Sequence, residues 1–212
     1  MDKLLEYLTN PLFLVLIVFI VLLLAFNILQ KLGRGKVWKQ IAAEMGLQFS
    51  KHRTATYRDQ QLSGIYRKRP LALIESESEE YQADQRRLSR DSNQTNTDTE
   101  IRLKINISKG IKMSLNRVIA IGETAQVTGD AEIDRHFNIT SEPDWLAKKV
   151  IASSNIHPTL PQLKMGSSIF IQKDELLFTH PGRISDGKYL RFLFDFLVDL
   201  ADAVETAAID VS

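Results

Sequence analysis

The sequence contains no cysteine and carries almost no net charge. Without cysteine the chain can form no disulfide bond, no zinc site with thiolate ligands and no cysteine nucleophile. Its 27 Lys and Arg residues nearly balance its 26 Asp and Glu residues, which leaves a formal net charge of +1. This balance gives no electrostatic reason to expect a nucleic-acid partner, and we predict none.

The short motifs of common catalytic centres are also missing. G-x-S-x-G, H-E-x-x-H and G-x-G-x-x-G do not occur. The tightest group of chemistry-bearing side chains is Asp130, Asp134 and His136. Carboxylates suit a hard metal ion and imidazole suits zinc, so these three are weak catalytic candidates, although their spacing matches no known ligand motif. We predict no cofactor and no metal site, and we lean toward a function without catalysis.

One long apolar run stands out against this ordinary background. Residues 11–29, PLFLVLIVFIVLLLAFNIL, contain no charge and no glycine. At about 1.5 Å per residue such a helix is roughly 28 Å long, close to the ~30 Å hydrocarbon layer of a bilayer. A buried core helix is usually shorter, and a cleaved signal peptide would need a small-x-small site, which is missing at Ala25. The run predicts a transmembrane helix, with the lipid bilayer as a partner through residues 11–29.

The cations that flank this run are unevenly distributed. Only Lys3 precedes it, whereas Lys31, Arg34, Lys36 and Lys39 follow it. Lys and Arg prefer the cytoplasmic side of a membrane. The pattern therefore predicts a single-pass protein of the cell membrane with its N-terminus outside and its C-terminal domain in the cytoplasm. The four cations after the run are expected to face anionic lipid.

The rest of the chain predicts one domain. We divide the sequence into a short lead (1–10), the transmembrane helix (11–29), a basic juxtamembrane linker (30–36) and a soluble α+β domain (37–212). Residues 76–100 are polar and rich in Ser and Thr, so they cannot bury enough apolar surface to order themselves. We expect a flexible loop there.

Period-2 alternation of apolar residues predicts several antiparallel hairpins. Residues 61–66 and 70–75 flank the basic tip of Arg67, Lys68 and Arg69, residues 100–107 precede a partner strand at 111–115, and residues 169–171 precede 176–178. If residues 132–139 are also a strand, Asp134 and His136 share one of its faces.

Helical spacing predicts a short helix over 37–47, another helix capped by Ser141, and a closing amphipathic helix over about 186–207. The closing helix carries an acidic stripe of Asp195, Asp199 and Asp202, which we expect to be solvated. The predicted fold class is thus α+β: an N-terminal transmembrane helix, then a single domain of antiparallel hairpins packed with helices, ending in the long helix.

Residues 129–163 carry a familiar pattern. G-D-x-x-I-D-x-x-F-x-I, then a helix, then a Pro-initiated short helix ending in L-x-x-L, resembles uncharacterised membrane-anchored bacterial domains of unknown function. The matching positions are Gly129, Asp130, Asp134, Phe137, Ile139, Pro158, Leu160 and Leu163. The resemblance implies a bacterial α+β domain and no particular activity.

Three functions remain open from the sequence. The first is a tether or accessory subunit that binds a protein partner at the membrane. The second is a metal-assisted hydrolase at the membrane surface, using Asp130, Asp134 and His136. The third is a sensor of anionic lipid that uses the basic residues at 31–39 and 67–69.

Overall fold

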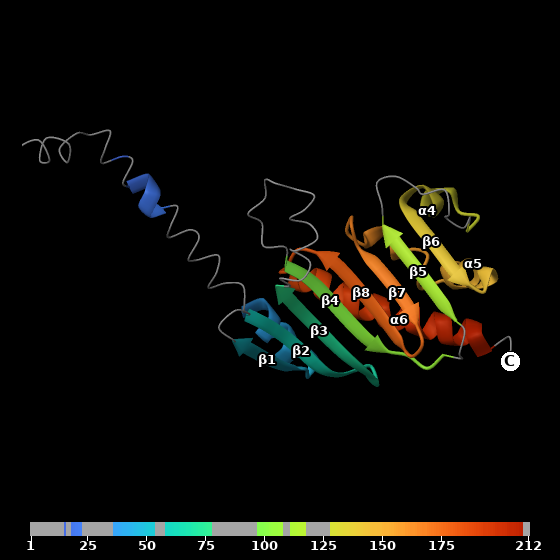
Figure 1. Ribbon diagram of the computed structural model, residues 1–212, viewed down its shortest axis with the longest axis horizontal. Coiled ribbons are helices and arrows are strands. Elements are labelled where there is room, and N and C mark those ends of the chain that lie inside the picture. The colour runs from blue at the N-terminus through green and yellow to red at the C-terminus, as the bar shows by residue number, and fades with distance from the viewer. Residues whose placement is uncertain are drawn as a thin grey trace, which may run out of the picture.

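The computed structural model describes residues 15, 18–22, 36–53, 58–77, 97–107, 111–117 and 128–209. In this part of the chain the strands form one antiparallel sheet in the order β1-β2-β3-β4-β8-β7-β5-β6 (Figure 1). The strands are β1 (Gln48–Arg53), β2 (Arg58–Tyr66), β3 (Arg69–Glu77), β4 (Thr97–Lys104), β5 (Lys112–Arg117), β6 (Phe137–Glu142), β7 (Ser168–Gln172) and β8 (Glu175–Pro181).

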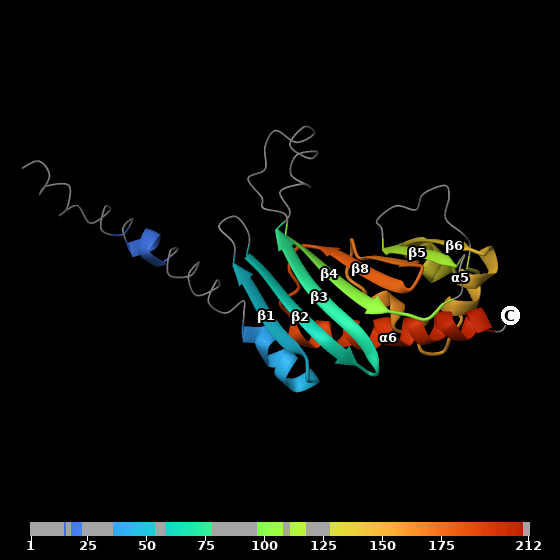
Figure 2. The same ribbon diagram turned by 60° about the horizontal axis from the view of Figure 1, so that its bottom comes forward.

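From residue 36 onward, the described helices pack on one face of this sheet. They are a helix over residues 36–45, α4 (Ala131–His136), α5 (Asp144–Ile151), the 3₁₀ turn η1 (Leu160–Gln162) and α6 (Gly187–Ile209). Figures 1 and 2 show α6 running beneath the strands. The first helix packs near the start of α6, where Trp38 is buried and its Nε1 donates to the Ile184 carbonyl at 3.0 Å.

The core lies between the sheet and α6, and alternation along the strands creates it. Residues that pair in register from strand to strand form an apolar row across the sheet, and each is at most 1% exposed: Leu62, Leu73, Ile101, Phe178, Ile169, Leu115 and Ile139. Because successive side chains on a strand alternate between faces, this burial leaves a second, more polar set facing away from the helices.

The predicted fold class is wrong at its N-terminal element. No described helix combines the length and the apolar character needed to cross a membrane. Of residues 11–29 the structure describes Val15 and residues 18–22. The finding that no described helix can cross a membrane contradicts the transmembrane helix and the single-pass location in the cell membrane, and it gives no support to the bilayer as a partner. The lead at 1–10, Lys31 and Arg34 lie outside the described residues.

The second correction concerns which strands are neighbours. The strands at 100–107 and 111–115 were expected to pair with each other, but β4 pairs with β3 and β8, and β5 pairs with β6 and β7. The β7–β8 hairpin lies between them, so the expected hairpins become parts of one continuous sheet. Alternation specifies which face of a strand is buried, but it does not specify which strand lies next to it.

Other local predictions are confirmed. β2 and β3 form the first predicted hairpin, and β7 and β8 form the third. The closing helix is α6, whose first turn is capped by the Asp186 carboxylate, which accepts from the backbone N–H of Lys188 at 2.9 Å. The short helix ends at residue 45, before Gly46, whose φ of +68° suits glycine. Most of the predicted 76–100 loop lies outside the described residues.

The basic tip between β2 and β3 contacts the acidic stripe on α6. Arg69 reaches Asp202 at 2.5 Å and Glu205 at 2.6 Å, and Arg67 reaches Asp199 at 2.8 Å. We call these contacts the turn–helix clamp. The sequence predicts that the acidic stripe is solvated, yet its carboxylates pair with the arginines of the tip and hold α6 against the β2–β3 turn.

We expect Arg69→Ala to lower the free energy of unfolding at neutral pH by about 1–3 kcal/mol, the usual range for hydrogen bonds to charged groups. The pair is largely shielded from water, because the side chains of Arg69 and Glu205 are only 16% and 21% exposed. Urea denaturation would measure the loss. Arg102→Ala is the matched control: its side chain is 47% exposed beside Glu100, and we expect about 0–1 kcal/mol. Equal losses would contradict a special role for the clamp.

The clamp also predicts a pH dependence. The hydrogen bond from Arg69 holds the pKa of Glu205 below its ordinary value of 4.5. A carboxyl group with a depressed pKa stabilises the fold above its unfolded pKa, and this contribution is lost as the pH falls through the folded value. The stability difference between the parent and Arg69→Ala should therefore be complete above about pH 5 and shrink below it. Urea denaturation across this range tests the prediction, and a constant difference down to about pH 3 would refute it.

Candidate functional site

The sheet face that points away from the helices carries an exposed aromatic residue. Phe170 on β7 is 42% exposed, and its register partner on β8 is the half-buried Leu177. The same row continues to Arg102 on one side and to Ser114 on the other. We call this side of the sheet the open face, because the described helices pack against the other side (Figure 2).

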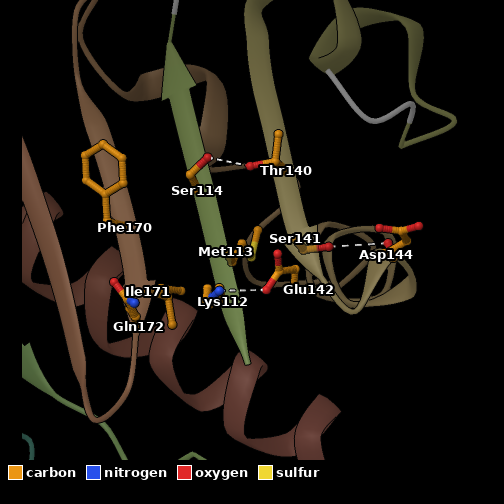
Figure 3. Close-up of a pocket in the computed structure, with 10 residues that line it drawn as sticks. All are labelled: Lys112, Met113, Ser114, Thr140, Ser141, Glu142, Asp144, Phe170, Ile171 and Gln172. Carbon is orange, nitrogen blue, oxygen red and sulfur yellow. Dashed lines mark hydrogen bonds and ion pairs between the residues drawn. The ribbon is translucent and has the colours of Figure 1, made fainter. Parts of the chain in front are cut away.

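A shallow groove of about 390 Å³ lies on the open face beside Phe170. It runs over β5 and is flanked by β6 and β7 (Figure 3). Its hollow follows from side-chain size, since Ser114 on β5 is small and Phe170 beside it is large. The lining residues are Lys112, Met113, Ser114, Thr140, Ser141, Glu142, Asp144, Phe170, Ile171 and Gln172.

Polar pairs line the groove. Lys112 Nζ lies 2.9 Å from Glu142 Oε2, and the hydroxyls of Ser114 and Thr140 are 2.7 Å apart (Figure 3). The Lys112 and Glu142 side chains are largely exposed, so water screens their attraction and little energy is needed to separate them. The lining includes no histidine. The arrangement supplies an aromatic surface and exchangeable hydrogen-bonding groups, which suits binding better than proton transfer.

Asp130, the first predicted site residue, caps a helix. Its Oδ1 accepts from the backbone N–H groups of Glu132 at 2.9 Å and Ile133 at 3.0 Å. Its Oδ2 lies 2.6 Å from Nε2 of His157, and this hydrogen bond lowers the pKa of Asp130. The carboxylate thus satisfies the first turn of α4.

Asp134 and His136 lie in different surroundings. Asp134 accepts from the backbone N–H of Thr128 at 2.8 Å, from the Thr128 hydroxyl at 2.7 Å and from the backbone N–H of Gly129 at 3.3 Å. His136 is exposed and lines a separate hollow of about 100 Å³ with Arg117 and Glu132. Among the described residues, no three His, Asp or Glu side chains are placed to share a metal ion.

The conditional strand over 132–139 explains why the three residues looked related. Residues 131–136 are the helix α4, and the strand begins only at Phe137. On a strand Asp134 and His136 would share a face, whereas two positions apart on a helix they point about 200° apart. The sequence also missed His157, the partner of Asp130, because 27 residues separate them.

One sequence signal could have located the open-face aromatic. Ile169-Phe170-Ile171 interrupts the alternation by placing an apolar residue between two others that are buried. In a sheet with one buried face, the middle residue must point outward. An apolar residue at such a position is a candidate contact residue.

The basic residues assigned to lipid divide into two groups. Lys36 and Lys39 are exposed on the first helix, and Lys39 Nζ lies 5.6 Å from the ring centroid of Phe49. Arg67 and Arg69 belong to the turn–helix clamp. The described cations therefore form no continuous patch with the basic tip, whose two arginines are paired within the protein.

Comparison with known proteins identifies one similar fold. The crystal structure of the mycobacterial trehalose monomycolate transport factor A, TtfA, matches with a TM-score of 0.51 and 11% sequence identity, over 81% of this chain and 94% of that chain. At this identity the likeness concerns the fold alone. No protein-family model matches the sequence, and no curated protein is significantly similar to it. The resemblance to uncharacterised bacterial domains stays a prediction.

We expect Asp134→Ala to destabilise the protein by about 1–3 kcal/mol, because the buried Thr128 hydroxyl and N–H lose their acceptor. If Asp134 has a structural role, urea denaturation should give the same loss in free energy of unfolding for Asp134→Ala with and without EDTA. Glu132→Ala, two positions away and exposed, is the control with little expected effect. A parent protein that loses stability on EDTA treatment, and an Asp134→Ala variant that does not respond, would instead indicate a bound metal ion.

Proposed function

We propose that this domain is a non-catalytic binding module, an accessory subunit that docks a protein partner on the open face of its sheet. The observation that carries the proposal is Phe170, which is 42% exposed on the interior strand β7, on a face that the described helices leave uncovered. An exposed aromatic residue costs solubility, so its place on an interior strand of a regular sheet favours a contact surface.

The surroundings of Phe170 have the composition of a protein-binding hot spot. Leu177 and Phe170 form an apolar pair in register, with Arg102 on the next strand. Aromatic residues and arginine dominate binding hot spots, and polar groups around them form the rim. Here the Lys112–Glu142 pair and the Ser114–Thr140 pair supply such a rim.

The groove beside Phe170 fits a side chain of a partner better than a metabolite. Its volume of about 390 Å³ is near the lower end for ligand pockets, about 300–1,000 Å³, and it is open rather than enclosed. Lys112 in the groove is paired with Glu142, so this lysine gives the groove no strong preference for a negatively charged ligand. A neutral or apolar side chain inserted next to Phe170 would complement it.

The comparison with TtfA supports an accessory role. That protein is named a transport factor, and its fold covers most of this chain. We extend from that name only the idea of a helper in a larger assembly. The hydrolase hypothesis has less support, because Asp130 and Asp134 accept hydrogen bonds from backbone groups around α4, whereas His136 lines a separate hollow. The lipid-sensor hypothesis has less support because Arg67 and Arg69 pair with α6.

We expect Phe170→Asp to weaken partner binding at least about tenfold while the fold remains intact, because a hot-spot residue contributes about 2 kcal/mol or more. A photo-crosslinking residue at position 170 would first capture the partner in cells. Binding of the purified partner to parent and variant would then be measured by calorimetry.

Met165→Asp is the matched control, since Met165 is 46% exposed but lies in the connection before β7, outside the sheet. It should bind the partner as the parent does. Leu177→Asp should behave like Phe170→Asp. If both open-face variants kept parental affinity, the partner would bind elsewhere and the proposal would fail.

A further inference from the structure

The two outermost strands of the sheet differ in how they avoid pairing with other chains. β1 and β6 stand at the two ends of the strand order. β1, QFSKHR, carries the exposed Lys51, and a cationic side chain on an edge strand opposes pairing with another strand. β6, FNITSE, carries no cation, and its one charge is Glu142 at the end. β6 lacks the protection that β1 has.

β6 is also regular along its whole length. Six consecutive residue pairs join it to β5, from Arg117 with Phe137 to Lys112 with Glu142, with no extra residue that would form a bulge. Proline appears only after the strand, at Pro143. A bulge and an internal proline are common ways of blunting a sheet edge, and β6 uses neither.

We propose that β6 pairs antiparallel with β6 of a second copy of this chain, so that two eight-stranded sheets become one continuous sheet. This goes beyond the binding of a different protein, and it uses the edge of the sheet rather than its open face. A twofold axis perpendicular to the sheet keeps each face on its own side, so core-side residues meet core-side residues.

The sequence of β6 is complementary to itself in one register. With the axis at Ile139, that residue faces its own copy, Asn138 faces Thr140 of the second copy, and Phe137 faces Ser141 of the second copy. Side chains of Phe137, Ile139 and Ser141 are buried on the helix side, whereas Asn138 and Thr140 belong to the open face. No like charges meet.

The neighbouring register is worse. With the axis at Thr140, Phe137 would face Pro143, which has no N–H to donate, and Asn138 would face a glutamate. Of these two alignments, the chemistry of the strand favours the one with the axis at Ile139.

An unsatisfied atom supports the same interface. Oδ1 of Asn138 is buried and has no hydrogen-bond partner among the described residues. A buried polar atom without a partner costs about 1–3 kcal/mol. Rotation of the amide toward the second copy would bring it to the Thr140 hydroxyl there, which is free to donate when Ser114 is the donor of the bond between them.

The absence of cysteine makes the register directly testable. In the double variant Asn138→Cys with Thr140→Cys, cysteine 138 of one copy faces cysteine 140 of the other. We expect mild oxidation of the full chain to give a dimer that dithiothreitol dissolves, analysed by non-reducing electrophoresis. The matched control is Ser114→Cys with Asn116→Cys, two open-face positions with the same spacing on the interior strand β5. It should give no disulfide-linked dimer in the same electrophoresis.

Sedimentation of the parent chain supplies the second measurement. One pair of edge strands forms a small interface, so we expect the dimer to have a dissociation constant on the order of 1–100 μM. Thr140→Lys should raise the dissociation constant of the dimer at least about tenfold. Ser63→Lys, which places a lysine on the open face of the interior strand β2, should leave the dissociation constant unchanged. A monomeric parent up to about 1 mM, or equal cross-linking of both cysteine pairs, would overturn the proposal. So would an edge that becomes protected from hydrogen exchange only when a different protein is added.

Discussion

One-sided burial of the sheet is the constraint on which the rest of this structure depends. Alternate residues of the strands enter one core with α6, and the apolar row from Leu62 to Ile139 crosses most of the sheet without interruption. A shift of any strand by one residue would expose its apolar set, so this row fixes the register of each strand it crosses. The same constraint produces the open face, because every side chain excluded from the core must point away from α6. Phe170 is exposed for this reason: its two neighbours, Ile169 and Ile171, take the core positions.

Local pattern predicted the elements well and their arrangement poorly. The β2–β3 and β7–β8 hairpins and the closing helix follow from alternation, turn residues and helical spacing within short windows. The position of the β7–β8 hairpin between β4 and β5 cannot be predicted from these patterns. Apolar alternation shows which side of a strand is buried, and any strand with the same buried side can pair with it. The turn–helix clamp was also beyond such windows: Asp202 was predicted to be a solvated charge, but the fold brings it to Arg69, 133 positions away in the sequence. The transmembrane prediction rested on the length and apolar composition of one run, and the described helices contradict it.

The candidate site shows the same division between local and distant information. Asp130, Asp134 and His136 attracted attention because they are close in sequence, yet two of them serve the local backbone around α4 and the third lies in another hollow. Proximity in sequence is a poor guide to shared chemistry when the segment is a helix, since residues two apart point in different directions. The groove beside Phe170 assembles side chains from β5, β6, β7 and the start of α5, and no window of the sequence contains them all. Of the residues that line the groove, Phe170 is the one that the sequence could have indicated, because it breaks the apolar alternation.

The open face and the β6 edge have consequences for each other. A twofold axis perpendicular to the sheet leaves both open faces of the proposed dimer on the same side. Since the groove lies over β5, one strand from the edge, its two copies would stand about three strand spacings apart, roughly 14–15 Å at ~4.8 Å per spacing. A single partner with two suitable segments could then engage both grooves, and the second contact would be intramolecular, which raises the overall affinity without any new type of interaction. Weak dimerisation would in this way be strengthened by the partner, because a ligand that binds both copies together stabilises the dimer by mass action.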